Sequence, residues 1–488
     1  MAAALPPPPA VGGVGKGERL RVRDLLVASG LDSGSLERAT QLGGGQLDVV
    51  RLPLLRSALA DEPILLLFAY GVGQPRSALE AVLDGDAIDV LRRFGLLAVG
   101  DDGTVHSPVR LLPMAGLLVA CDHHIASAPS LVMGPGPTTA ELAWAMPRPP
   151  EGRVLDVGTG AGSLALLAAA QGAPTVATDI TKRAVAFARF NAAFNGVELD
   201  VRPGSLLEPV KRELFDLVVS QPPFVMQPSE VDSITYVHGG ETGEELALEL
   251  IRGLPEVLAD DGIALLRLDT LDDGGFAARA HAVAPALDVV VFGYQGAEID
   301  LVALGYGILA DPTLGATFEE AAGRYYRHGR LVAGPRLRST ITVLRRRAGA
   351  GDAVEAEVGV RRAPRWPEIA ARLAALDAAA NDDRALLAIR LSPPVDARLA
   401  AEQDLDAGGR EPAYLVRFPA DGLLADNAIN ETGAALLQLF AGGVGVAAVL
   451  GAYAEGSGMP AADAAADVLA FVRDALQRGL LTPCAPNG

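Results

Sequence analysis

The sequence reads VLDVGTGAG from Val154 to Gly162. An apolar run that ends beside an acid and three alternating glycines predicts a buried strand, a tight turn and the start of a helix. Glycine permits the sharp turn and lets a ligand approach the backbone without meeting a Cβ atom. The following helix is expected over Ser163–Ala170. This stretch therefore predicts the first strand–helix unit of a parallel sheet, with a ligand bound at the turn.

The glycine spacing indicates which ligand the turn would bind. It is G-x-G-x-G with Asp156 two residues before the first glycine, unlike the G-x-G-x-x-G pattern that seats a pyrophosphate. A carboxylate at this point disfavours phosphate and attracts an ammonium or sulfonium group, and S-adenosylmethionine carries both cations and no phosphate. Asp179, about twenty residues farther on, ends the second predicted strand and can accept hydrogen bonds from ribose hydroxyls. Together the two acids favour S-adenosylmethionine as the ligand.

The flanking chain, from residue 150 to 347, alternates strands and helices at the spacing of βαβ units. The predicted strands are Arg153–Val157, Thr175–Asp179, Leu199–Arg202, Phe215–Ser220, Gly262–Leu268, Asp288–Phe292 and Ser339–Arg345. Seven strands with helices between them predict a mostly parallel, Rossmann-like α/β sheet covered on both faces.

A second stretch, LVVSQPPF at 217–224, ends the fourth strand with two prolines and an aromatic ring. Proline ends a strand because it lacks the N–H that the ladder needs. The Gln221 side-chain oxygen and the Pro222 carbonyl are two acceptors that could orient the N–H bonds of a planar target nitrogen, and the prolines hold them rigidly. Phe224 can stack on the flat face of the same group. We interpret this loop as the place where a methyl group is transferred to nitrogen.

The motifs DVGTGAG (156–162), TDI (178–180) and SQPPF (220–224) together resemble those of class I S-adenosylmethionine-dependent methyltransferases. The resemblance covers about residues 130 to 347 and is strongest for the methyltransferase small domain group, which includes release-factor glutamine N5-methyltransferases and rRNA or tRNA base N-methyltransferases. It implies a cofactor site made of Asp156, Gly158, Thr159, Gly160, Gly162, Asp179, Ile180, Ser205, Leu206 and Ser220. It implies a catalytic loop made of Gln221, Pro222, Pro223 and Phe224.

The sequence departs from this family at two positions. Family members often have an aspartate where Ser205 stands, and an Asn, Asp or Ser where Gln221 stands. The longer glutamine moves its acceptor by about 1.5 Å, one bond length, which leaves the substrate class open. Upstream, the segment 136–141 resembles the one that closes over the cofactor, and Thr138 with Glu141 predicts a capping box. His238 either borders the target pocket or belongs to a Gly-Gly turn before the next helix.

Over its whole length, the sequence predicts five regions. They are a disordered tail at 1–17, a helical, winged-helix-like domain at 18–125, the methyltransferase domain at 126–347, a linker at 348–359 and a C-terminal helical, winged-helix-like domain at 360–488. In the first domain, helices are expected at 51–67, 77–83 and 87–94. The C-terminal 65 residues loosely resemble small peptide-binding proteins that present precursor peptides, as in pyrroloquinoline-quinone biosynthesis. A helical subunit-docking module would give the same pattern.

Composition limits the partners. The 488 residues contain 41 Lys and Arg against 60 Asp and Glu, a net charge of −19, which weighs against a large nucleic-acid footprint. Eight arginines and no acid lie between Arg324 and Arg347, and we interpret them as a charged edge strand rather than an RNA-binding face. Two distant cysteines predict neither disulfides nor a metal site, and favour the cytoplasm. The uncharged stretch 432–454 predicts packed helices rather than a membrane span. Oligomeric state is left open.

Three functions remain open from the sequence. The favoured one is N-methylation of an amide or amine on a protein or peptide side chain, with glutamine as the model. The second is N-methylation of an RNA base, in which the winged-helix-like modules hold the RNA. The third is methylation of a small molecule in a biosynthetic pathway.

Overall fold

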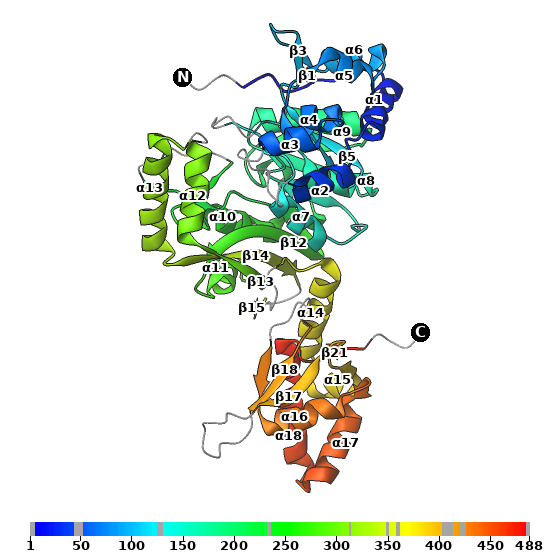
Figure 1. Cartoon of the computed structure of the whole chain (residues 1–488). Helices are drawn as coiled ribbons and strands as arrows, with labels where there is room; N and C mark the ends of the chain where they lie inside the picture. The colour runs from blue at the N-terminus through cyan, green and yellow to red at the C-terminus, as the bar shows by residue number, and fades with distance from the viewer. Residues whose placement is uncertain are drawn as a thin grey trace. The chain divides into compact units, whose positions relative to one another are not determined.

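The structure is a computed structural model that describes residues 5–42, 52–123, 130–229, 231, 236–311, 314–347, 351–357, 362–402, 413–419 and 426–484. The chain forms two compact units. The first comprises residues 1–291 and 296–355, and the second comprises residues 292–295 and 356–488. Each unit is described separately (Figure 1).

The central sheet has eight strands in the order β15-β13-β14-β12-β9-β6-β7-β8. Their bounds are β6 Val154–Val157, β7 Thr175–Asp179, β8 Asp200–Pro203, β9 Phe215–Ser220, β12 Leu258–Leu271, β13 Leu287–Glu298, β14 Arg336–Arg346 and β15 Ala353–Glu357. The five strands β8, β7, β6, β9 and β12 pair in parallel, and β14 runs antiparallel to β12. All seven predicted strands form, within a sheet that has one strand more than predicted.

The chain order of the parallel strands reverses between β6 and β9. From β6 the chain moves through β7 to β8, and then returns to place β9 on the other side of β6. In open α/β sheets a ligand binds where the carboxyl ends of two such strands diverge. Helices α8 (Ser163–Ala170) and α9 (Lys182–Asn195) connect β6, β7 and β8. The other helices of this region are α7 Pro137–Ala145, α10 Glu245–Gly253, α11 Phe276–Val283, α12 Ile299–Ala310 and α13 Ala316–Val332.

The linker predicted at 348–359 is wrong for its middle part. Residues 353–357 form β15, which adds to the sheet next to β13. The sequence did not predict this strand because it consists mostly of alanine and glutamate, which have low strand propensity. The edge-strand interpretation of the arginine run is also wrong, because β14 lies between β13 and β12.

The arginines of that run are spread over α13 and β14, and several are paired with acids. Arg324 pairs with Glu320, Arg336 with Glu298 at 3.3 Å, and Arg345 with Asp288 at 3.0 Å. Residues from both ends of the run therefore neutralise neighbouring carboxylates of an acidic protein.

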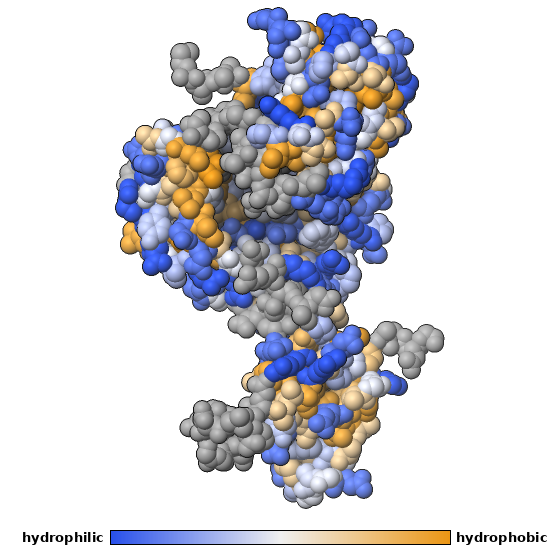
Figure 2. Space-filling model, in the orientation of Figure 1, coloured by the Kyte–Doolittle hydropathy of each residue, from blue (hydrophilic) through white to orange (hydrophobic). Residues whose placement is uncertain are grey.

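Helix α12 carries an exposed apolar stripe (Figure 2). Leu301, Leu304 and Ile308 follow one another at helical spacing and are 64%, 45% and 46% exposed. Ala303, on the opposite face of the helix, is buried in a cluster with Val225 and Tyr325. An apolar stripe of this kind differs from scattered exposed leucines, which are normal on a protein surface.

The N-terminal part of the first unit contains α1 Lys16–Ala28, α2 Ser33–Leu42, α3 Leu52–Ala58, α4 Pro63–Tyr70, β1 Gln74–Pro75, α5 Arg76–Glu80, α6 Gly85–Arg93, β2 Ala98–Val99 and β3 Thr104–His106. The three strands pair in the order β1-β3-β2. The single helix predicted at 51–67 is two helices, because Pro63 starts a new helix at its first turn.

The disordered tail predicted at 1–17 is wrong for its second half. The Ala10 N–H donates a hydrogen bond to the Phe94 carbonyl, Val14 is buried, and α1 already begins at Lys16. The first four residues lie outside the described part of the chain. Proline-rich composition suggested disorder, but a proline segment can also lie extended against an apolar surface without needing backbone partners of its own.

Two asparagines on α9 join the N-terminal part to the central sheet. Asn191 accepts a hydrogen bond from the Ala120 N–H (2.8 Å) and donates to the Ala120 carbonyl (2.9 Å). Asn195 does the same with Leu118 (2.9 and 2.8 Å). Both backbone residues belong to β5 (Leu117–Cys121), which pairs with β4 (Arg110–Met114). The two side chains thus satisfy the buried edge of the β4–β5 hairpin, as a neighbouring strand would.

The second unit contains α14 Trp366–Ala379, α15 Asp383–Ala388, β16 Arg390–Ser392, β17 Arg398–Glu402, β18 Ala413–Arg417, β19 Asn427–Ile429, α16 Glu431–Leu439, β20 Val444–Gly445, α17 Val446–Ser457, α18 Ala461–Arg478 and β21 Thr482–Pro483. Two small sheets have the orders β17-β18-β19 and β20-β16-β21. The uncharged stretch 432–454 forms α16 and α17, whose Leu436, Leu437 and Val449 are buried in the core of this unit. Across the described residues, none of the helices combines the length and apolar character needed to cross a bilayer.

We expect Asn191→Leu to lower the free energy of unfolding by about 3 kcal/mol, since it leaves buried backbone groups at Ala120 and Ala161 without their partner. Urea denaturation followed by circular dichroism measures this, with the exposed Lys182→Met on the same helix as the control. Equal unfolding free energies for the two variants would contradict the anchoring role of Asn191.

Candidate functional site

The loop after β6 has the backbone that its glycines predict. Gly158, Gly160 and Gly162 have φ of +70°, +55° and +87°, a region that favours glycine. A Cβ atom on Gly158 or Gly160 would meet no protein atom within 4 Å, whereas one on Gly162 would lie 3.2 Å from Ala188 of α9. The first two glycines therefore border open space, and the third permits close packing between the loop and α9.

Asp156 lies inside this loop rather than on its open side. Its side chain is buried and accepts hydrogen bonds from the Thr159 hydroxyl (2.6 Å) and the Ala165 N–H (3.1 Å). Burial raises the pKa of this carboxyl to about 6. Asp156 and Thr159 thus fix the shape of the loop, and Asp156 places a carboxylate charge behind it at neutral pH.

Asp179 lies beside the same loop, at the end of β7. It accepts hydrogen bonds from the Gly160 N–H (3.0 Å), and from the N–H and hydroxyl of Thr181 (2.8 and 3.0 Å). The next residue, Ile180, is 58% exposed. A carboxylate followed by an exposed apolar side chain suits a sugar bearing an aromatic base, because it offers hydrogen-bond acceptors next to a surface for stacking.

The segment after β8 reaches the same place. The Gly204 N–H donates to the Asp179 carbonyl (3.0 Å), and the Thr178 hydroxyl donates to the Leu206 carbonyl (3.3 Å). Leu206 has a positive φ of +47°, and both Ser205 and Leu206 are partly exposed. The structure therefore brings the segment that contains Ser205 and Leu206 to the end of β7, where Asp179 lies.

Ser220, predicted to contact the cofactor, is buried and has a partner inside the protein. Its hydroxyl donates a 2.8 Å hydrogen bond to the Val157 carbonyl. This bond joins the end of β9 to the end of β6, directly before the Gln221 loop and the glycine loop begin. In this structure Ser220 positions the two loops relative to each other.

Gln221 is held by the helix that precedes the first strand of the parallel set. Its Nε2 donates to the Thr138 hydroxyl (2.8 Å), and the Thr139 hydroxyl lies 3.5 Å from its Oε1. The predicted capping box of Thr138 and Glu141 is wrong: α7 begins after Gly136 without a side-chain cap. Thr138 instead binds Gln221, and Glu141 pairs with Arg267 of β12 at 2.8 Å.

The segment Gly239 to Gly243, which the sequence suggested only as a turn, supports the Pro-Pro-Phe loop. A Cβ atom on Gly239 would overlap the Pro223 carbonyl oxygen, and one on Gly243 would overlap the Phe224 carbonyl oxygen. The two backbones therefore lie against each other with no room for side chains. The signal was present in the sequence as GGETG, but glycines before a helix are also typical of an ordinary turn.

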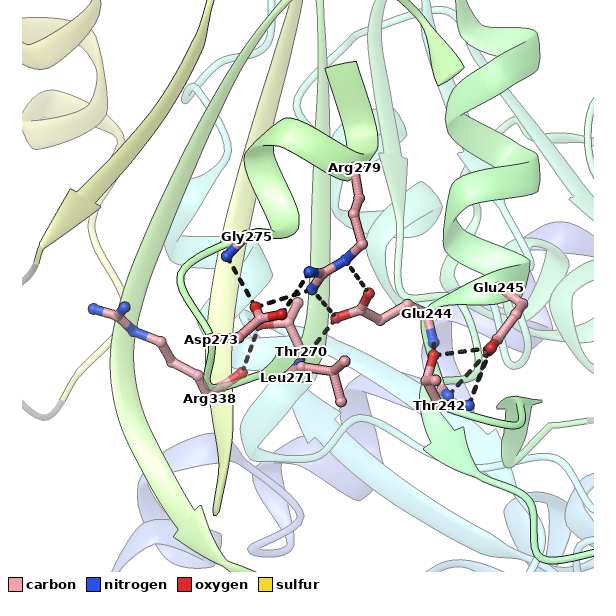
Figure 3. Close-up of polar contacts among 10 residues, drawn as sticks. Thr242, Glu244, Glu245, Thr270, Leu271, Asp273, Gly275, Arg279 and Arg338 are labelled. Atoms are coloured by element: carbon pink, nitrogen blue, oxygen red, sulfur yellow. Dashed lines mark hydrogen bonds and ion pairs between the residues drawn. The ribbon is translucent and has the colours of Figure 1, made fainter. Parts of the chain in front are cut away.

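This glycine segment is anchored to the sheet by a buried acid (Figure 3). Glu244 accepts a hydrogen bond from the Leu271 N–H (2.9 Å) at the end of β12 and two from Arg279 of α11 (2.8 Å each). Arg279 also pairs with Asp273 at 2.7 Å. Because Glu244 is buried and doubly bonded to a guanidinium, this contact is directional and fixes where the glycine segment lies.

His238 does not lie in an open pocket. It is buried on β11 (His238–Gly240), which pairs with β10 (Val225–Met226), and its Nε2 lies 2.7 Å from the Tyr325 hydroxyl. Burial lowers the pKa of His238, so the ring is neutral at pH 7. The simpler of the two interpretations of His238 is supported, since the residue links β11 to α13. The described residues contain no cluster of three or more His, Cys, Asp or Glu arranged to hold a metal ion.

Comparison with known proteins gives two family matches. Residues 136–263 match the methyltransferase small domain, and residues 427–481 match coenzyme PQQ synthesis protein D. The first match contains the glycine loop, Asp179, the Gln221 loop and the glycine segment that supports it. The second match lies within the second unit.

Three curated relatives are release factor glutamine methyltransferases. The one from Deinococcus radiodurans is 37% identical over 127 residues, which are 24% of this chain and 45% of the relative. The one from Geobacter sulfurreducens is 29% identical, over 30% of this chain and 56% of the relative. The one from Mycolicibacterium smegmatis is 31% identical over 254 residues, 49% of this chain and 83% of the relative. The chain thus spans about half the length of the first two relatives and most of the third.

We expect the stability of Asp156→Asn, relative to the wild type, to increase as the pH rises from 4 to 7. The folded pKa of about 6 lies above the unfolded value of about 3.9, so the free energy of unfolding of the wild type falls by about 2 kcal/mol as Asp156 ionises across this range. Asparagine keeps an acceptor oxygen and does not ionise. Urea denaturation at several pH values measures the difference, and a difference that stays constant with pH would contradict the burial of Asp156.

Gly243→Ala is expected to destabilise the protein by about 1–3 kcal/mol more than Gly274→Ala, because only the former must displace a neighbouring carbonyl. Gly274 is a suitable control, since it also has a positive φ (+66°) and a Cβ there would meet no atom. Both variants share the cost of left-handed backbone, about 1–2 kcal/mol. Similar denaturation midpoints for the two variants would show that the close approach at Phe224 is not tight.

Proposed function

Since the chain belongs to the class I S-adenosylmethionine-dependent methyltransferases of the methyltransferase small domain group, we propose that it transfers a methyl group from S-adenosylmethionine to an amide or amine nitrogen of a protein or peptide. One observation supports this most strongly. The glycine loop and the Gln221 loop follow β6 and β9, which are hydrogen-bonded neighbours at the point where the sheet order reverses. The donor and acceptor of a group transfer would therefore be bound side by side.

The residues beside the glycine loop fit S-adenosylmethionine. Gly158 and Gly160 border open space, Asp156 puts a negative charge behind the loop, and Asp179 with Ile180 offers acceptors and an apolar surface. We assign the methionine part of the cofactor to the glycine loop, its ribose to Asp179, and its adenine to the side formed by Ile180, Ser205 and Leu206. When bound, the cofactor supplies an electrophilic methyl group on a sulfonium.

Gln221 and the Pro222 carbonyl would orient the target nitrogen. The Gln221 Nε2 is committed to Thr138, while its Oε1 has only the weak 3.5 Å contact with Thr139 among the described residues, so it retains acceptor capacity for a target N–H. Holding both N–H bonds leaves the nitrogen lone pair directed toward the methyl group, and the transfer then depends on positioning more than on acid–base groups. Phe224 would cover the flat face of the target.

A polypeptide substrate is favoured by three features. The matched relatives are named as glutamine methyltransferases of a protein. The α12 stripe of Leu301, Leu304 and Ile308 is apolar, and the other face of α12 belongs to the same buried cluster as Val225, next to the Gln221 loop. The match of residues 427–481 to PqqD favours a second unit that binds a peptide and presents it.

We place the reaction in the cytoplasm.

Methylation of an RNA base is the second candidate, since the N-terminal helices and three-stranded sheet have the element order of a winged helix. The residues where such a module would contact a polyanion weigh against it. Helix α6 carries two acids, Asp86 and Asp89, and two arginines, both of which are paired: Arg92 with Asp89 at 3.9 Å and Arg93 with Glu18 of α1 at 3.0 Å. A helix with this charge balance gives little attraction for phosphate.

The proposed function is tested with radiolabelled S-adenosylmethionine and a lysate of the native host. Label that is lost after protease treatment supports the proposal and leads to the labelled side chain by mass spectrometry. Label that is lost after nuclease treatment would establish the RNA alternative instead. Label that survives both treatments would indicate a small molecule.

Two substitutions separate the cofactor site from the target site. Asp179→Ala is expected to weaken S-adenosylmethionine binding by about 100-fold, since hydrogen bonds to a charged acceptor contribute about 1.5–3 kcal/mol each. Gln221→Ala is expected to leave binding within about threefold and to slow methyl transfer by about 10- to 100-fold, because it removes positioning only. Calorimetry and label transfer measure these effects, with Asp200→Ala on β8 as the control. Unchanged affinity for Asp179→Ala would remove Asp179 from the cofactor site.

A further inference from the structure

Arg267 is a charged side chain between two buried leucines of β12, Leu266 and Leu268, and it is almost completely buried. It lies on β12 with 4% of its surface exposed. Its neighbour Leu266 pairs with Ser220, so Arg267 lies one residue beyond the end of β9, level with the start of the Gln221 loop. A buried arginine needs partners for its charge and its N–H groups, and those partners indicate what it holds in place.

The partners of Arg267 come from three elements. Its Nε donates to Glu141 of α7 at 2.8 Å, one terminal nitrogen donates to Asp269 of β12 at 2.7 Å, and the other lies 3.3 Å from the Ser339 hydroxyl of β14. Ser339 in turn donates to Asp269 at 2.8 Å. Two carboxylates with one guanidinium give a directional, charge-assisted contact that a lysine could not reproduce. The sheet side of the guanidinium is thus fixed by Asp269 and Ser339, and Glu141 connects α7 to it.

The same guanidinium lies over the Phe224 ring. The distance from the Arg267 Cζ to the ring centroid is 5.2 Å, within the range of a cation–π contact. The contact is desolvated, since Arg267 is buried, and this strengthens the attraction. The orientation of the aromatic side chain in the Pro-Pro-Phe loop is therefore linked to the position of Arg267.

Helix α7 also connects Arg267 to Gln221. Glu141 and Thr138 are three residues apart and so lie on one side of the helix. Glu141 binds Arg267, and Thr138 accepts the hydrogen bond from the Gln221 Nε2 at 2.8 Å. The same helix therefore connects Arg267 to one of the two key side chains of the loop, while Arg267 contacts the other directly.

We propose that Arg267 is a positioning residue that sets both target-binding side chains of the loop at once: Phe224 by direct contact, and the Gln221 carboxamide through Glu141 and Thr138 of α7. This inference rests on the proposed function, in which Gln221 and Phe224 contact the target. It assigns no contact with the cofactor or target to Arg267 itself. Its consequence is that loss of the Arg267–Glu141 pair lowers the rate of transfer through the geometry of the loop.

Two variants break the pair, and a third serves as a matched control. Arg267→Met removes the charge and keeps most of the length of the side chain, and Glu141→Gln breaks the ion pair while keeping an acceptor oxygen. Arg153→Met is the control, since Arg153 also pairs with a glutamate, Glu213, and also lies over a phenylalanine, Phe215, with 4.7 Å from its Cζ to the ring centroid. Arg153 directly precedes β6, at the end of that strand opposite the glycine loop.

The first readout needs no substrate. Trp144 lies on α7, and the other tryptophan of the chain is Trp366, so in a Trp366→Phe background the emission reports on α7 alone. We expect Arg267→Met and Glu141→Gln to shift this emission and to speed amide hydrogen exchange over residues 139–145 by at least about tenfold. Arg153→Met is expected to do neither. Normal α7 emission and exchange in folded Arg267→Met and Glu141→Gln would overturn the proposal.

The second readout is label transfer to the acceptor fraction identified in the lysate. We expect Arg267→Met and Glu141→Gln to lower kcat by about 10- to 100-fold with a smaller change in KM, since positioning acts on the transition state. The double variant Arg267→Met/Thr138→Val should lose less than the product of the single losses, because both act through the Gln221 carboxamide. Fully multiplicative losses, or a loss in KM alone, would overturn the proposal.

The two readouts also separate this inference from the proposed function. A wild-type protein that transfers no label to any acceptor contradicts the proposed function, while the emission and exchange of α7 still report whether Arg267 holds the helix. If Arg267→Met fails to fold, Glu141→Gln carries the same test, because it keeps the buried arginine paired with Asp269.

Discussion

The hydrogen bond from the Ser220 hydroxyl to the Val157 carbonyl is the interaction on which the candidate site depends. It is 2.8 Å long and buried, and it joins the ends of β6 and β9 at the point where the order of the sheet reverses. The glycine loop follows one strand and the Gln221 loop follows the other. In the proposed function, a direct bond between the two strand ends would help to fix the distance between cofactor and target, to which a transfer reaction is sensitive.

Rigidity at the Gln221 loop comes from both backbone and side-chain contacts. Gly239 and Gly243 lie against the carbonyls of Pro223 and Phe224, where a Cβ atom would not fit. Arg267 and α7 contact the side chains of Phe224 and Gln221. Two prolines alone would give a stiff turn, but they would not determine its orientation. The glycine segment and Arg267, which are far apart in sequence, both contact the turn and orient it.

At Asp156, the negative charge that would favour a cationic ligand also lowers the stability of the folded protein. Asp156 is fully enclosed, and its burial raises its pKa to about 6, so its ionised form destabilises the folded state at neutral pH. A neutral side chain there would be more stable but would supply no negative charge behind the glycine loop. Asp179, by contrast, lies at the edge of the same loop with its carboxylate bonded to the Gly160 N–H, so its charge is supported by local donors. The two acids would contact one ligand only in the proposed complex. They differ in environment: Asp156 is buried, whereas Asp179 accepts hydrogen bonds at the edge of the loop.

The sequence by itself determined the local features of this protein. Alternation of apolar strands and helices predicted the parallel sheet, and three glycines after a strand predicted a sharp turn, because those preferences act within a few residues. Only the tertiary structure decided the partners: Glu141 pairs with Arg267 rather than capping its own helix, Ser220 bonds to Val157, and residues 353–357 join the sheet. Such pairings depend on which strands become neighbours, and the free energy of burying a polar group with its partner cannot be assigned until both are placed.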